Sequence, residues 1–151
     1  MRSFIVLLFV LAPVLSFSQN ITWDGEHYLD NKGNLYCGTY TVYTESGTVS
    51  ASYELRKGEL HGAVCTYHNN GAIQQMGHYS HGRKDGMWIT WNEDHQKTGE
   101  AFYDEGSKTG VWRIWHANGG LQYLMSFSNN ERTNDWKIYD QENNLICEKV
   151  F

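Results

Sequence analysis

A period of 24 residues governs this chain. Glycine recurs on three ladders of that spacing, and asparagine usually stands where glycine is missing. The ladders run through Gly38, Gly62, Gly86, Gly110 and Asn134; through Gly47, Gly71, His95, Gly119 and Asn143; and through Gly58, Gly82, Gly106 and Asn130. Glycine and asparagine best tolerate a positive φ. The ladders therefore predict turns that repeat in register.

Apolar columns with the same spacing lie between the ladders. They are Tyr40, Val64, Trp88, Trp112 and Trp136; Tyr43, Tyr67, Trp91, Trp115 and Tyr139; Leu55, Tyr79, Tyr103, Phe127 and Phe151; and Val49, Ile73, Leu121 and Leu145, interrupted by Lys97. Two strands of about seven residues, a turn and a G-x-x-x-G connection such as residues 82–86 fill each unit. We therefore expect an all-β fold: one elongated antiparallel sheet, a meander of stacked 24-residue β-hairpin repeats.

The chain divides into three segments. Residues 1–18 resemble a signal peptide, with Arg2 before an apolar run and cleavage expected near Ser18/Gln19. That run is short for the alternative, an uncleaved membrane anchor. Residues 19–36 form a degenerate leading half-repeat that caps the sheet edge, and residues 37–151 form the repeat domain. We expect an exported protein, located in the periplasm, in the cell envelope or outside the cell, without a transmembrane segment in the mature chain.

The mature chain is acidic. It carries eleven Lys and Arg residues against seventeen Asp and Glu residues, a net charge of −6. A protein that binds duplex nucleic acid needs a concentrated positive face, so nucleic acid is not an expected partner.

Phrases such as YSHGRKDGMWITW and YDEGSKTGVWRIWHANGGL resemble the MORN repeat in its bacterial variant form. The resemblance covers about residues 35–151. The last unit departs from it at Asn130 and Asn134, and another unit departs at His95. The resemblance implies an elongated β-sheet module that contacts proteins or membrane surfaces. Many bacterial members are labelled antitoxin components of the YwqK type.

Residues with catalytic or metal-binding chemistry form no known motif. The sequence lacks G-x-S-x-G, H-E-x-x-H and C-x-x-C. His78 and His81, with His61, are close enough in sequence to share a metal, but His61 and His81 occupy connection positions where solvated polar residues recur. The acidic pairs Glu93-Asp94 and Asp104-Glu105 fall at predicted turns. We expect no enzyme activity, no cofactor and no metal.

The three cysteines are expected to form no intrachain disulfide. Cys37 and Cys147 lie more than four repeats apart, and Cys37 and Cys65 are out of register with each other. A dimer linked through Cys147 is the alternative to a buried thiol.

Two columns are candidates for binding. Trp88 and Trp91 are three residues apart, so in a regular strand they point to opposite faces. We expect one aromatic column in the core and the other, Tyr67, Trp91, Trp115 and Tyr139, as an exposed binding face, unless a bulge intervenes. Lys84, Lys108 and Arg132 predict a basic edge formed by connections, which either meets an anionic partner or protects the sheet from aggregation.

These features favour a non-catalytic binding or scaffold module that holds a protein partner, with antitoxin-like inhibition as a special case. The alternative is a repeat protein that binds carbohydrate or a membrane surface, because flat aromatic rings stack on sugars.

Overall fold

The computed structural model describes residues 20–150, apart from the side chains of Asn134 and Asp135. The predicted signal peptide, its cleavage site at Ser18/Gln19 and Phe151 lie outside the described residues.

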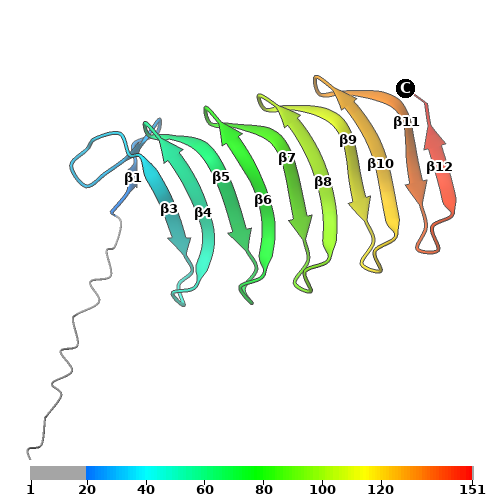
Figure 1. The fold of residues 1–151 in the computed structure, drawn as a ribbon, viewed down its shortest axis with the longest axis horizontal. Helices are drawn as coiled ribbons and strands as arrows, with labels where there is room; N and C mark the ends of the chain where they lie inside the picture. The colour runs from blue at the N-terminus through cyan, green and yellow to red at the C-terminus, as the bar shows by residue number, and fades with distance from the viewer. Residues whose placement is uncertain (1–19, 151) are drawn as a thin grey trace, which may run out of the picture.

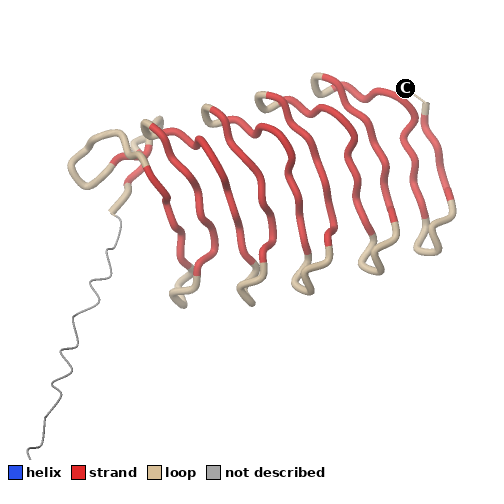
Figure 2. The backbone as a smooth tube through the Cα atoms, viewed as in Figure 1, coloured by secondary structure: helices blue, strands red, loops and turns tan. Residues whose placement is uncertain are grey.

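Ten consecutive strands form one antiparallel sheet, in which every strand pairs with its neighbours in sequence (Figure 1). The strands are β3 (Gly38–Tyr43), β4 (Val49–Arg56), β5 (Glu59–Tyr67), β6 (Ile73–Ser80), β7 (Arg83–Trp91), β8 (Lys97–Asp104), β9 (Ser107–Trp115), β10 (Leu121–Ser128), β11 (Glu131–Tyr139) and β12 (Leu145–Lys149). Residues 20–150 contain no helix (Figure 2). The predicted all-β meander of hairpin repeats is confirmed.

One end of the sheet is closed by tight two-residue turns. Both turn residues have positive φ, as a type I′ turn requires: 47° and 73° at His81-Gly82, and 48° and 70° at Asn129-Asn130. The second turn residue also donates its N–H to the preceding repeat, from Gly82 to the Leu60 carbonyl at 2.8 Å and from Gly106 to the Lys84 carbonyl at 2.7 Å. The third ladder therefore both turns the chain and joins successive repeats.

Five-residue loops close the other end. In each, the fourth residue has positive φ, and this residue is Gly47, Gly71, His95, Gly119 or Asn143. Its N–H donates to the carbonyl of the first loop residue, as from Gly71 to His68 at 2.9 Å. The second ladder is thus a turn ladder, as predicted, and His95 adopts the left-handed conformation with a φ of 61°.

The first glycine ladder was wrongly predicted to lie in turns. Gly62, Gly86 and Gly110 lie inside β5, β7 and β9, so the connections are two residues long and not G-x-x-x-G segments. At Gly86, residues 86–88 oppose the single residue Gly77 of β6, and at Gly110, residues 110–112 oppose Ala101 of β8. Such bulges bend a strand. The odd-numbered strands β5, β7 and β9 curve near their beginnings (Figure 1).

Residues before the sheet form a separate two-stranded element, β1 (Thr22–Trp23) and β2 (Tyr28–Leu29). It does not pair with the edge strand β3. Instead Tyr28 donates its N–H to the Gly58 carbonyl at 2.9 Å, and its ring centroid lies 5.6 Å from that of Tyr40. The segment therefore packs against the first tight turn and the first ring of the repeat domain.

Candidate binding surface

One face of the sheet carries a ladder of aromatic rings, which we call the ring face. Its members are Tyr40, Tyr53, Tyr79, Trp88, Tyr103, Trp112, Phe127 and Trp136, and neighbouring centroids from Tyr79 onward lie 4.9–6.3 Å apart. Val64 and Leu55, exposed by 3% and 4%, fill the interval between Tyr53 and Tyr79. Trp88 is also only 3% exposed. The ring ladder therefore supplies the core of this single-layer sheet.

The predicted basic edge lies on the ring face. Lys84, Lys108 and Arg132 belong to strands β7, β9 and β11 and not to the connections. The Lys84 ammonium lies 3.8 Å from the Trp88 ring centroid, and the Arg132 guanidinium carbon lies 4.5 Å from that of Trp136. Burial lowers the pKa of Lys84. These cations cover the core rings through cation–π contacts, a use that the column spacing did not reveal.

The predicted binding column, Tyr67, Trp91, Trp115 and Tyr139, lies on the other side, which we call the opposite face. The register shift beside Trp91 places the extra residue, Thr98, on the partner strand β8. Side-chain alternation along β7 therefore continues from Trp88 to Trp91. The four side chains are half-buried. Each packs in register with the next strand, at Ile73, Lys97, Leu121 and Leu145.

The centre of the opposite face changes character along the sheet. In β5 to β7, Cys65, Met76 and Ile89 pair in register. Met76 is 43% exposed, and Met87, which points to the same face as Ile89, is 47% exposed. From β8 onward the same row becomes mainly charged, with Glu100, Arg113, Lys137 and Glu148 around Leu124. One half of this face is therefore apolar and the other half is charged.

Glu100 organises the charged half. Its carboxylate accepts a hydrogen bond from Lys97 Nζ at 2.9 Å and another from Arg113 Nη1 at 2.8 Å. The bond from Lys97, with a smaller contribution from Arg113, holds the pKa of Glu100 below its ordinary value. Lys97 Nζ also lies 4.8 Å from the Trp115 ring centroid. This network holds the Lys97 ammonium and the Glu100 carboxylate beside the aromatic column.

Two histidines that sequence reasoning left unassigned join repeats at the loop end. His68 Nε2 lies 2.9 Å from the Trp91 carbonyl, and His116 Nε2 lies 3.0 Å from the Tyr139 carbonyl. Asn70 and Asn118 donate to the carbonyls of Glu93 and Gln141, in the same two repeats. The signal was present in the segments HNNG and HANG, 48 residues apart.

The remaining candidates are placed as follows. His61 lies 5.0 Å from His81 and 6.4 Å from His78 between ring centroids, yet within residues 20–150 no three His, Cys, Asp or Glu side chains are arranged to hold a metal. Glu93, Asp94, Asp104 and Glu105 are exposed. Cys37, Cys65 and Cys147 are free thiols.

Comparison with known proteins supports the repeat assignment. The sequence model of the MORN repeat variant matches residues 60–81 and 108–129. These segments cover β5 with β6 and β9 with β10, the hairpins whose loops carry His68 and His116. A search of curated proteins found no match. The matched segments fall in one register with three further hairpins of the same sheet. Two of the five hairpins of the sheet are therefore repeats of the MORN variant type.

Proposed function

We propose that this chain is a non-catalytic module that holds a protein partner against the opposite face of its sheet. The observation that carries the proposal is the apolar half of that face, where Met76 and Met87 are 43% and 47% exposed and lie on the same face as Trp91. Methionine and aromatic residues are enriched in protein interfaces, and flexible methionine adapts to a partner's shape. A contiguous exposed apolar surface marks an interaction site.

The charged half of the face supports the same proposal. Paired charges at the rim of an interface direct the orientation of a partner more than they add affinity. Glu100 with Arg113 and Lys137 with Glu148 form such pairs, at 2.8 Å and 3.2 Å. A partner that covers the apolar half would be aligned by these groups.

We place this activity in the cell envelope or outside the cell, after cleavage near Ser18/Gln19. The apolar run that follows Arg2 supports export. Antitoxin-like inhibition of a toxin is a special case of the same binding mode. Within residues 20–150, the chain contains no helix with the length and apolar character needed to span a membrane.

Affinity capture from envelope extract tests the proposal. Residues 19–151 serve as bait, and bound proteins are identified by mass spectrometry. We expect one partner in near-equal amount, reduced at least about tenfold when Trp91 and Trp115 are both replaced by alanine, because aromatic anchors dominate interfaces. The control is Asn69→Ala in the loop after β5, which should retain the partner. A folded bait that enriches no protein would contradict the proposal.

Carbohydrate binding is the second candidate, and one observation favours it. A groove of about 390 Å³ on the ring face is lined by Tyr103 and Trp112 together with Lys84 and Thr90. Rings beside ammonium and hydroxyl groups suit a sugar. Oligosaccharides should then change the tryptophan fluorescence of the chain, and the change should be lost in the Trp112→Ala variant. If the chain instead binds a protein on the opposite face, we expect oligosaccharides to cause no such change in fluorescence.

A further inference from the structure

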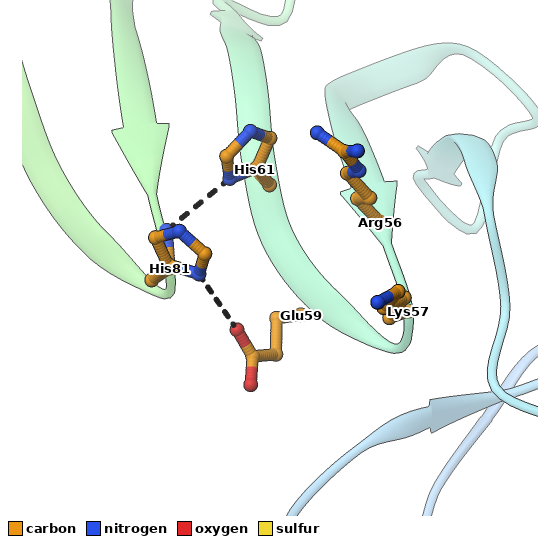
Figure 3. A pocket seen from close by; sticks show the side chains of 5 residues that line it. All are labelled: Arg56, Lys57, Glu59, His61 and His81. Carbon is orange, nitrogen blue, oxygen red and sulfur yellow. Dashed lines mark hydrogen bonds and ion pairs between the residues drawn. The ribbon is translucent and has the colours of Figure 1, made fainter.

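A cationic pocket lies at the tight-turn end of β4 and β5 (Figure 3). It has a volume of about 300 Å³ and is lined by Arg56, Lys57, Glu59, His61 and His81. Arg56 and Lys57 come from the end of β4 and its turn, while His81 belongs to the next tight turn. The pocket therefore draws its side chains from two successive repeats.

The His61 ring accepts a hydrogen bond from the backbone of the next repeat. Its Nδ1 accepts a hydrogen bond from the His81 N–H at 3.4 Å. The proton of a neutral ring therefore lies on Nε2, which becomes a donor. Figure 3 shows His61 and Arg56 on neighbouring strands, and both line the pocket. Two donors from neighbouring strands thus border the same space.

The pocket already holds one carboxylate of the chain itself. Glu59 Oε2 lies 3.7 Å from His81 Nδ1. The Glu59 carboxylate lies beside His81, and the Arg56 guanidinium lies apart from it (Figure 3). A guanidinium fork beside an imidazole donor matches the planar, two-oxygen geometry of a carboxylate.

The next repeat supplies a natural comparison. The corresponding pocket has a volume of about 290 Å³ and is lined by Ser80, His81, Arg83 and Glu105. Asp85 stands where His61 stands one repeat earlier, and its Oδ1 accepts the Glu105 N–H at 3.3 Å. Both pockets contain this hydrogen bond between repeats. The second pocket lacks the N–H donor that the His61 ring supplies in the first. Cation enrichment therefore belongs to the first pocket and is not required by the fold.

We propose that Arg56 and His61, with Lys57 and His81, form a binding site for a carboxylate, either of a small acid or of an acidic side chain in a peptide. The site lies at the tight turns and shares no residue with the Trp91 and Trp115 variants, so its test is separate from the test of the function proposed above.

Titration with succinate, followed by ¹H–¹⁵N resonances of the histidine and arginine side chains, tests this site. We expect saturable shifts at His61 and Arg56 with a dissociation constant of about 1–10 mM, typical of a small anion held by few contacts. His61→Asp should weaken binding at least about tenfold, since it removes one charge-assisted donor and adds a negative charge. It should remain folded because Asp85 makes the same backbone bond one repeat later. Arg56→Gln provides a second, independent loss.

Thr109→Asp is the matched control, because Thr109 occupies the His61 position two repeats later and the change adds the same charge. It should bind succinate as the parent chain does. A peptide with alternating Asp residues that binds tighter than succinate would assign the carboxylate to a protein source, and equal affinity would assign it to a small acid. The proposal is overturned if no saturable shift occurs at His61 and Arg56. It is also overturned if inorganic phosphate at equal ionic strength binds equally well, or if the His61→Asp and Arg56→Gln variants bind unchanged.

Discussion

Replacing Gly77 with alanine is expected to lower the free energy of unfolding by about 3 kcal/mol, although alanine is ordinarily the better strand residue. Gly77 is the single residue of β6 that faces the bulge of β7, and the indole of Trp88 lies directly on it. A methyl group at Gly77 would collide with that ring. Trp88 cannot move away easily, because it is only 3% exposed. Urea unfolding measures the change.

Gly99→Ala is the matched control. Gly99 also lies inside a strand, and an added methyl group would closely meet only the hydroxyl of Thr90, a small group that can rotate. Its cost should stay below about 1 kcal/mol. A double-mutant cycle identifies the cause, since Gly77→Ala should cost little in a Trp88→Ala background. Equal costs of Gly77→Ala in both backgrounds would show that the ring is not the reason for the glycine.

Trp88→Ala is expected to destabilise the chain by about 4 kcal/mol, the usual range for removal of a buried tryptophan. The ring contacts Tyr79 and Tyr103 at centroid distances of 5.1 Å and 6.3 Å, and it lies beneath the Lys84 ammonium. A single-layer sheet has no second layer to fill the space left by the ring. The loss should appear in thermal unfolding as a lower Tm.

Trp91→Ala is the comparison for that experiment. The two tryptophans are three residues apart in β7, but Trp91 is half-buried on the opposite face. Its removal should cost clearly less than the removal of Trp88. A Trp91→Ala variant as unstable as Trp88→Ala would contradict the division of the sheet into a ring face that stabilises and an opposite face that binds.

Much of the fold could be predicted because the 24-residue spacing reports backbone geometry directly. Asn130 and His95 stand on glycine ladders and have φ values of 70° and 61°, so their positions specified turns despite the substitutions. The separation of Trp88 from Trp91 likewise followed from alternation along one strand. At these residues, the predictions that rest on backbone φ and on the alternation of side chains along a strand were therefore correct.

The Gly86 ladder shows where such reasoning ends. A glycine with positive φ serves equally in a turn or in a β-bulge, and the sequence does not distinguish them. Gly86 has a φ of 68° inside β7, close to the 73° of Gly82 in a turn. The position of Lys84 over Trp88 spans that bulge, and Arg56 and His61 share a pocket through the pairing of β4 with β5. The 24-residue spacing alone does not show which side chains of neighbouring repeats come into contact.

Side-chain footprinting of the captured complex tests the central claim most directly. Hydroxyl radicals oxidise exposed methionine readily, and Met76 and Met87 report on the opposite face at 43% and 47% exposure. Ile114 is 37% exposed and pairs with Gly99, which places it on the ring face. We expect the bound partner to protect Met76 and Met87 and to leave Ile114 as reactive as in the free chain. Protection of Ile114 with unchanged oxidation of both methionines would contradict it.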